Sequence, residues 1–161
     1  MGDIRPDVII NTAAYTAVDQ AESDTELAFA VNEHGAANIA HAARKCNSSL
    51  VHISTDFVFD GHTRIPYLPS SPTGPLSVYG KSKLAGEYSI REILGDDALI
   101  VRGGWLYSSH SSNFVLTMIR VMNANSYVTV VDDQVGTPTW SRRFAAGIWN
   151  MIENNVTGTM K

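Results

Sequence analysis

The chain has 161 residues and a mass of 17.5 kDa, which is the size of a single domain. Twelve basic and 16 acidic residues give a net charge of −4 and a pI near 5.6, so we expect no nucleic-acid or membrane-surface partner. No apolar stretch approaches the ~20 residues that a spanning helix requires, the start of the chain lacks a signal-peptide pattern, and the single cysteine excludes an internal disulfide. These features predict one cytoplasmic domain over residues 1–161.

Short apolar runs alternate along the chain with longer stretches of helical spacing. This alternation is typical of an α/β fold in which helices cover a parallel sheet. We predict strands at 7–11, 49–55, 98–104 and 127–132. We predict helices after Ser23 and over 77–94, 113–124 and 141–154. Residues 62–76 hold four of the six prolines, so this segment is expected to be an irregular surface loop.

The helix after Ser23 has the clearest pattern. Ser23 and Glu26 have the spacing of a capping box. Apolar or small residues then recur at every fourth position, which predicts one buried face: Leu27, Val31, Gly35, Ile39 and Ala43. The helix over 113–124 has Asn113 as its expected N-cap, and its Phe and Met residues form a stripe that is expected to face the core.

Tyr79 and Lys83 are the most informative pair in the sequence. Their i, i+4 spacing places a phenol and an ammonium on one helical face. A phenol of pKa ~10 exchanges protons poorly at neutral pH, and a neighbouring ammonium draws that pKa downward. The structural alternative is a tyrosine packed on a lysine stem, since the spacing is common by chance.

The strand over 49–55 adds context, because it ends in polar residues. Ser54, Thr55 and Asp56 stand at the carboxyl end of an expected parallel strand, where open α/β sheets place their ligands. A hydroxyl here is suited to bonding a substrate oxygen or the tyrosine. A simple Ser/Thr turn is the alternative.

Two other patterns are weaker. The run from Gly74 to Ser82 resembles a phosphate-binding P-loop, but its first glycine is one residue too early and Pro75 lacks an N–H group. His34 and His41 are seven residues apart without acidic or cysteine partners at ligand spacing, so no metal site is expected.

Seven stretches together resemble the extended short-chain dehydrogenase/reductase family, and within it the reductases of dTDP-linked 4-keto-6-deoxy sugars. They run in order along nearly the whole chain: DVIINTAAYTAVDQAE (7–22), AVNEHGAANIA (30–40), STDFVFDG (54–61), PLSVYGKSKLAGE (75–87), RGGWLY (102–107), NFV (113–115) and VVDDQVGTPT (130–139). The resemblance implies a partial doubly wound, Rossmann-type parallel sheet with helices on both faces, and NADPH or NADH as cofactor.

The resemblance also implies roles for individual residues. Tyr79 would donate a proton to the sugar C4 carbonyl oxygen, and Lys83 would lower the pKa of Tyr79 and hold the nicotinamide ribose. Thr55 would tune the tyrosine and touch the substrate. The other expected contacts are Ala14, Tyr15 and Thr16 with the cofactor, and Asp56 and Trp105 with the dTDP-sugar; Gln134, Gly136, Pro138 and Thr139 match a loop of mainly structural role.

One part of the family pattern is not matched. Family members begin with a strand, a Gly-rich turn and a helix, whose backbone N–H groups hold the pyrophosphate. None of the 12 glycines forms such a turn near the start, so we expect a chain that opens at the family's fourth strand and also stops short after Gly158. Cofactor binding by these 161 residues is therefore expected to be weak or absent.

Three functions remain open at this stage. The first is the reductase, which the joint presence of Thr55, Tyr79 and Lys83 favours. The second is a non-catalytic regulatory or binding subunit of the same fold. The third is a folded remnant without nucleotide binding, which the unmatched Gly-rich turn favours.

The strand over 7–11 is expected to be an exposed edge rich in apolar residues, which predicts a homo-oligomer formed through it.

Overall fold

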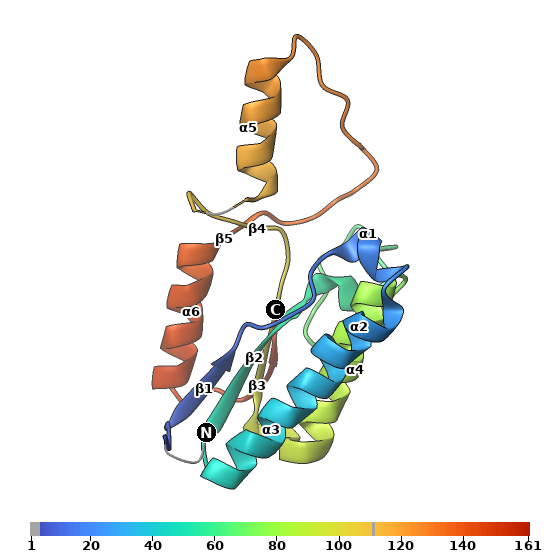
Figure 1. The fold of residues 1–161 in the computed structure, drawn as a ribbon. Helices are drawn as coiled ribbons and strands as arrows, with labels where there is room; N and C mark the ends of the chain where they lie inside the picture. Colours follow the sequence, from blue (N-terminus) through green and yellow to red (C-terminus); the bar gives the residue numbers. More distant parts are fainter. Residues whose placement is uncertain (1–3, 111) are drawn as a thin grey trace. The chain divides into compact units, whose positions relative to one another are not determined.

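The computed structural model describes residues 4–110 and 112–161 (Figure 1). The chain divides into two compact units, one made of Met1–Gly103 with Asn155–Lys161 and the other of Gly104–Asn154. The single domain expected from the length of the chain stays a prediction. In the described part of the chain, none of the helices combines the length and apolarity needed to cross a bilayer.

The larger unit is built on a parallel four-stranded sheet of order β1-β2-β3-β6. Its strands are β1 (Val8–Asn11), β2 (Ser49–Thr55), β3 (Leu99–Gly103) and β6 (Gly158–Met160). The predicted α/β class with a parallel sheet is confirmed, and so are three of the four predicted strands.

The fourth predicted strand, 127–132, is wrong. These residues form neither strand nor helix, and Tyr127 and Val131 are exposed. A β-branched run becomes a strand only when a neighbouring strand offers its hydrogen-bonding groups. The place beside β3 is taken instead by β6, a strand of three residues that pairs Leu99 with Gly158 and Val101 with Met160.

The helices of this unit lie on one side of the sheet (Figure 1), and the expected helices on both faces stay a prediction. They are α1 (Val18–Ala21), α2 (Thr25–Phe29), a π-helical turn (Ala30–His34), α3 (Gly35–Cys46) and α4 (Val78–Leu94). Helices α3 and α4 pack on each other and on β2. The core between these elements is made largely of small side chains, which bring the backbones close: Ala36, Ala40, Ala43, Leu50, Ile90, Ala98 and Ile100.

The capping box expected at Ser23 is wrong. The Ser23 hydroxyl donates to the carbonyl of Gln20 at 2.9 Å, which closes the turn after α1, and the N-cap position of α2 is Asp24. The expected stripe is buried only in part, since Ala43 is buried and Ile39 packs against the core, whereas Leu27 is exposed and its neighbour Ala28 is buried instead. A four-residue spacing alone does not identify which of two adjacent stripes faces the core.

The smaller unit contains α5 (Phe114–Ala124), α6 (Ser141–Glu153) and two short parallel strands, β4 (Leu106–Tyr107) and β5 (Thr139–Trp140). The predicted N-cap of α5 is confirmed, because the Asn113 side chain accepts from the Leu116 N–H at 3.1 Å. The expectation that the Phe and Met stripe of α5 is buried is wrong, since Phe114 and Met122 are exposed.

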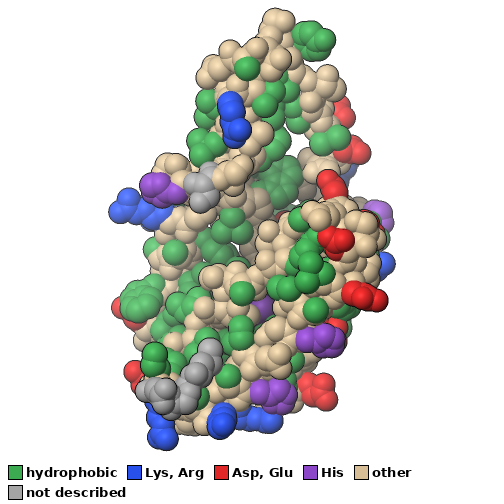
Figure 2. All heavy atoms as spheres, in the orientation of Figure 1, with side chains coloured by type: hydrophobic (Ala, Val, Ile, Leu, Met, Phe, Trp, Pro, Cys, Tyr) green, Lys and Arg blue, Asp and Glu red, His purple; other side chains and the backbone are tan. Residues whose placement is uncertain are grey.

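The proline-rich segment is irregular, as predicted, with no helix or strand over 62–76. It is nevertheless fastened to the larger unit. The Gly74 N–H donates to the Val58 carbonyl at 2.9 Å, and the rings of Phe59 and Tyr67 stack at 4.4 Å. His34 and His41 are exposed, the first in the π-helical turn and the second in α3. Figure 2 shows several histidine side chains on the surface of the molecule, some of them near carboxylates.

Candidate active site

Helix α4 begins at the position that brings Tyr79 and Lys83 to the end of β2. The Ser77 hydroxyl caps the helix by accepting from the Gly80 N–H at 3.1 Å. The carboxylate of Glu22 is a second acceptor at this helix end, because the Val78 N–H donates to it at 2.8 Å. A carboxylate at this end of a helix is favourable because the first N–H groups are unpaired and the macrodipole is positive there.

Tyr79 lies buried in the first turn of α4, with its ring edge-on to Phe57 at a centroid distance of 5.5 Å. Burial raises the pKa of its phenol because the phenolate is poorly solvated there. A hydrogen bond with the Thr55 side chain acts in the lowering direction on this pKa, and the charge of Asp56 acts in the raising direction. Tyr79 is therefore a neutral phenol in this site, and the lowering of its pKa by Lys83 stays a prediction, since burial raises this pKa here.

Thr55 forms the Ser/Thr turn that its sequence position allowed, and its expected contact with the substrate stays a prediction. Its side chain caps the short 3-10 turn Asp56–Val58 by accepting from the Phe57 N–H at 3.2 Å, as a Ser/Thr turn does. The same side chain bonds with Tyr79 and lies 3.3 Å from the Asp56 carboxylate. Burial raises the pKa of Asp56. The structure thus brings Thr55, Asp56 and Tyr79 together.

Lys83 is 1% exposed, one turn further along α4. Its Nζ donates to the Ile53 carbonyl at 2.7 Å and lies 3.3 Å from Nε2 of His52. Burial lowers the pKa of Lys83 to about 8, against the opposing charge of Glu87. The predicted contact of Lys83 with a cofactor ribose stays a prediction, because in this structure the amine is enclosed by protein groups of β2.

Asn32 ties the predicted cofactor loop, Ala14–Thr16, to helix α4. Its Oδ1 accepts from the Tyr15 N–H at 2.8 Å, while its Nδ2 donates to the Tyr15 carbonyl at 3.1 Å and to the Ser82 hydroxyl at 2.9 Å. Ser82 in turn donates to the Tyr79 carbonyl at 2.9 Å. Asn32 lies in the π-helical turn, a distortion that is frequent at functional sites. The loop and the Tyr79 turn therefore share one hydrogen-bond network.

Trp105 belongs to the smaller unit, whereas the other predicted site residues belong to the larger one. Its backbone has a φ of 47°, and its carbonyl accepts from the Thr139 N–H at 3.1 Å. Its indole covers Gly136 so closely that a Cβ at position 136 would collide with the ring. The loop that contains Gly136 and Thr139 thus supports Trp105, in agreement with its expected structural role.

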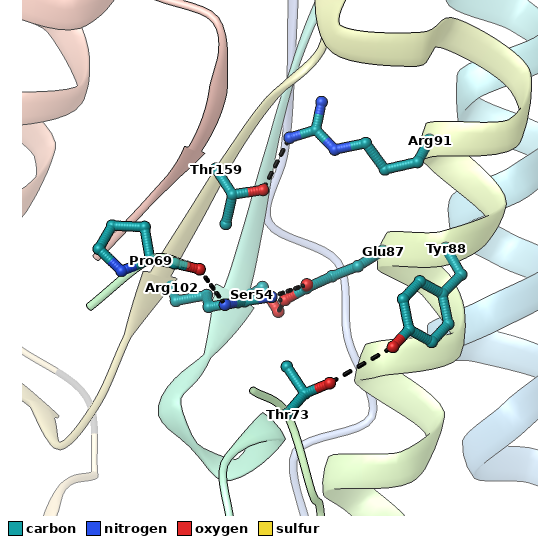
Figure 3. Close-up of polar contacts among 8 residues, drawn as sticks. All are labelled: Ser54, Pro69, Thr73, Glu87, Tyr88, Arg91, Arg102 and Thr159. Carbon is teal, nitrogen blue, oxygen red and sulfur yellow. Dashed lines mark hydrogen bonds and ion pairs between the residues drawn. The ribbon is translucent and has the colours of Figure 1, made fainter. Parts of the chain in front are cut away.

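A buried ion pair lies further along α4 (Figure 3). Glu87 accepts from Arg102 Nη2 at 2.6 Å and from Nε at 3.0 Å, and it also bonds with the Ser54 hydroxyl. Arg102 additionally donates to the Pro69 carbonyl at 3.1 Å, and its guanidinium lies over the Phe59 ring at 5.1 Å. This pair connects α4, the ends of β2 and β3, and the proline-rich segment.

Several residues of this site were not predicted from the sequence. Their common feature is a buried polar side chain whose partner is distant along the chain: Asn11, Asn32, His52, Ser82, Glu87 and Arg102. One signal was present for His52, because a histidine interrupts the otherwise apolar start of the strand over 49–55. For the others the signal is the pairing itself, which a linear sequence does not display.

The comparisons with known proteins point to one family. The family model described as RmlD substrate binding domain matches residues 1–160. A dTDP-4-dehydrorhamnose reductase of Streptomyces griseus is 48% identical over 141 residues, which cover 88% of this chain and 46% of that protein. A dTDP-4-keto-6-deoxy-D-glucose reductase of Streptomyces niveus is 42% identical over 154 residues, 96% of this chain and 54% of that protein.

Solved structures agree with the sequence matches. The crystal structure of dTDP-4-dehydrorhamnose reductase from Bacillus anthracis in complex with NADP superposes with a TM-score of 0.94 at 41% identity, covering 98% of this chain and 56% of that one. The chain spans about half the length of the relatives that it matches. Because the family model matches almost every residue, the chain belongs to the RmlD substrate binding domain family, with the parallel α/β fold of the dTDP-4-dehydrorhamnose reductases.

Proposed function

We propose that the chain forms the catalytic part of an NADPH- or NADH-dependent reductase that converts dTDP-4-dehydrorhamnose, a dTDP-linked 4-keto-6-deoxy sugar, to dTDP-rhamnose. The observation that carries the proposal is the joint placement of Thr55, Tyr79 and Lys83 at the end of β2 and the start of α4. Relatives named as reductases of such sugars, at 42% and 48% identity, support it.

The residues present fit one end of a nicotinamide cofactor. Tyr79 and Lys83 share a helical face, and Asn32 fixes the Ala14–Thr16 loop against the same turn of α4. No segment of these 161 residues matches the pyrophosphate end of the cofactor, because the sequence holds no Gly-rich turn. The chemistry that a bound nicotinamide would supply here is a hydride for the C4 carbonyl carbon of the sugar.

The chain's own residues would supply the proton and the orientation. Tyr79 holds a proton at its phenol oxygen, in the form that a proton donor needs, and would transfer it to the carbonyl oxygen as the alcohol forms. The Thr55 side chain, which acts to lower the pKa of that phenol, would orient it. Asp56 and, from the smaller unit, Trp105 are the proposed further contacts with the sugar nucleotide.

The test is turnover by a fusion that adds a family member's Gly-rich nucleotide-binding segment ahead of residue 1. In that fusion Tyr79→Phe is expected to lower turnover of NADPH with dTDP-4-dehydrorhamnose by roughly 10²–10⁴, the usual scale for a lost general acid. Tyr88→Phe is the matched control, because Tyr88 is exposed on the same helix. A loss below tenfold for Tyr79→Phe would remove the residue from the mechanism.

A function without nucleotide binding is the second candidate, and the unmatched Gly-rich turn favours it for these 161 residues. We expect the chain alone to bind NADPH weakly or not at all, since the diphosphate would lose its backbone N–H cradle. Calorimetry of the chain and of the fusion distinguishes the two candidates. Submicromolar binding by the chain alone would show that a different pyrophosphate site exists.

Assembly through β1 is also a proposal. In the described residues β1 pairs on one side with β2, and Ile10 is 43% exposed, whereas Ile9 packs against the core. An edge of this kind is a template for a second copy. We expect sedimentation at micromolar concentration to show a dimer or larger species that Ile10→Lys dissociates, while Glu92→Lys on exposed α4 surface leaves it intact. A monomeric wild-type protein would contradict the proposal.

A further inference from the structure

Trp105 has a backbone conformation that large side chains rarely adopt. Its φ of 47° lies in the left-handed region, which is unfavourable for a residue with a bulky side chain. Among the described residues, the other non-glycine positions with a positive φ are Asn47 and Asn155, and asparagine tolerates this region. A tryptophan keeps such a conformation only when its surroundings hold it there.

Neighbouring groups hold the main chain of Trp105. Its carbonyl accepts from the Thr139 N–H at 3.1 Å. Strand β4 begins at the next residue and pairs with β5, so that Leu106 lies opposite Thr139 (Figure 1). The Tyr107 carbonyl accepts from the Ser141 hydroxyl at 2.9 Å. The direction in which the Trp105 side chain leaves the backbone is therefore fixed by the segment around β5.

Gly136 leaves space for the indole ring of Trp105. A Cβ at position 136 would collide with Cε2, Cζ2 and Nε1 of this ring, and these are the three nearest atoms that it would meet. Gly136 does not have a positive φ, so its backbone conformation does not require a glycine. The missing side chain at position 136 is therefore explained by the Trp105 ring and not by the course of the chain.

The Trp105 side chain is held in place without being enclosed. The residue is 41% exposed, although both its backbone and its ring have fixed supports. An aromatic ring with a free surface is suited to packing against the ring of a base or another flat ligand group. Because the supports are present before a ligand arrives, binding does not have to order this side chain.

We propose that Gly136 is a positioning residue for recognition of the sugar nucleotide: the absence of its side chain lets the indole of Trp105 lie on the loop and present its remaining surface to the ligand. The ligand part rests on the proposed reductase function, which includes a contact of Trp105 with the dTDP-sugar. The placement of the ring does not depend on that function, so the two parts are measured separately.

The first measurement is the accessibility of the Trp105 ring, by acrylamide quenching of tryptophan fluorescence in the purified chain. Substitution of Trp140 and Trp149 by phenylalanine leaves Trp105 as the single tryptophan. In this background Gly136→Ala should push the ring off the loop and raise the quenching constant by about twofold, since the residue is now 41% exposed. Gly147→Ala in α6 is the control, because a Cβ there would meet no atom within 4 Å. An unchanged quenching constant for Gly136→Ala would overturn the proposal.

The second measurement is steady-state turnover of dTDP-4-dehydrorhamnose by the fusion that carries a Gly-rich nucleotide-binding segment. Gly136→Ala should raise KM for the sugar nucleotide by about tenfold and change kcat by less than about twofold, because a contact that is equal in the ground state and the transition state acts on KM. Gly147→Ala should change neither constant. An unchanged KM for Gly136→Ala would overturn the proposal, whatever happens to kcat.

An inactive fusion would separate the two proposals. The reductase function would then fail, and calorimetry of the chain with dTDP-rhamnose would decide the ligand part of the inference. Binding that Gly136→Ala weakens by about tenfold would support it. The absence of binding by the wild type, or equal binding by the two proteins, would overturn it.

A double variant distinguishes the ring from the loop. Trp105→Phe provides a shorter ring without the Nε1 edge that lies on Gly136. In this background Gly136→Ala should change KM by less than about twofold, so the two substitutions are non-additive. A rise of about tenfold that persists in the Trp105→Phe background would show that the loop itself needs the glycine, and it would overturn the proposal.

The same double variant covers the case in which Gly136→Ala alone does not fold. The double variant should then fold, because the shorter ring removes the collision, and its failure to fold would overturn the proposal. Trp105→Leu, which removes the ring face, would replace Gly136→Ala in the KM measurement with the same expected rise of about tenfold. An unchanged KM for Trp105→Leu would again overturn the proposal.

Discussion

Two buried basic side chains in the larger unit are accommodated in opposite ways. Arg102 meets the carboxylate of Glu87 through two N–H groups, so its charge is matched by an equal and opposite one. Lys83 lies one turn before Glu87 on the same helix, yet its amine contacts a carbonyl and an imidazole. The ion-pair region around Arg102 thus keeps a full charge buried, whereas burial of Lys83 without a paired carboxylate lowers its pKa to about 8.

This difference indicates two different roles for the two buried cations, Lys83 on α4 and Arg102 on β3. A guanidinium does not lose its proton in proteins, so Arg102 is suited to holding elements together permanently. A lysine amine changes its proton state readily when it is buried, so Lys83 is suited to a step in which charge appears and disappears. We therefore expect substitutions in the ion-pair region to act mainly on stability, and those in the Lys83 region to act mainly on proton equilibria.

The largest effect on stability is expected from breaking the ion pair. Glu87→Leu leaves a buried guanidinium without its partner, which should cost about 3–5 kcal/mol of unfolding free energy in urea. Lys83→Met should cost less, about 1–3 kcal/mol, because it leaves hydrogen-bonding groups rather than a charge unpaired. The double variant Glu87→Leu with Arg102→Met should recover much of the loss. Equal losses for Glu87→Leu and Lys83→Met would contradict the comparison.

A second effect is expected in the pH dependence of stability. The pKa of His52 is lowered to about 3 from an ordinary value of 6.5, so between these values the unfolded chain binds a proton that the folded chain does not. The stability from this group is present above pH 6.5 and is lost as the pH falls toward 3, with a slope of up to about 1.4 kcal/mol per pH unit.

Urea unfolding at pH 7, 6, 5 and 4 measures this slope. The unfolding free energy of wild type minus that of His52→Gln is the quantity to compare, because the contributions of the carboxylates are common to both proteins and cancel. This difference should shrink as the pH falls. Substitution of the exposed His62 by glutamine is the control and should leave the slope unchanged. A wild-type slope equal to that of His52→Gln would mean that His52 is protonated in the folded state.

The smallest effect is expected at the start of α4, which serves both regions. Ser77→Ala removes the acceptor for the Gly80 N–H and should cost about 1 kcal/mol in urea unfolding. Ser109→Ala on an exposed surface should cost nothing measurable. A cost for Ser77→Ala as large as that of Glu87→Leu would show that the helix start, rather than the ion pair, dominates the stability of this region.

The parts of the fold that sequence patterns predicted are those in which the signal is local. Three apolar runs became β1, β2 and β3, and the i, i+4 spacing correctly placed Tyr79 and Lys83 on one helix. The run over 127–132 has the same local signal but no strand beside it, while Gly158–Met160 has a weak signal and pairs with β3. Strand identity was settled by pairing, which is a long-range property.

Prediction of the site from sequence has the same limit, because local patterns do not show long-range pairs. The positions of Thr55 and Tyr79 follow from where a strand ends and a helix begins. The partner of His52, by contrast, is Asn11, which lies 41 residues earlier in the chain, and no spacing rule connects the two. The roles of Ala14, Tyr15, Thr16 and Trp105 toward ligands stay predictions.

Gly86 gives the packing of α3 and α4 a functional consequence. A Cβ at this position would collide with the backbone carbonyl of Asn32 and press on Ala36, so the contact is closer than a single methyl group permits. Asn32 is also the residue that holds the Ala14–Thr16 loop and bonds with Ser82 on α4. The separation between the loop and the Tyr79 phenol therefore depends on a position that touches neither, where one added carbon atom would push Asn32 away from α4.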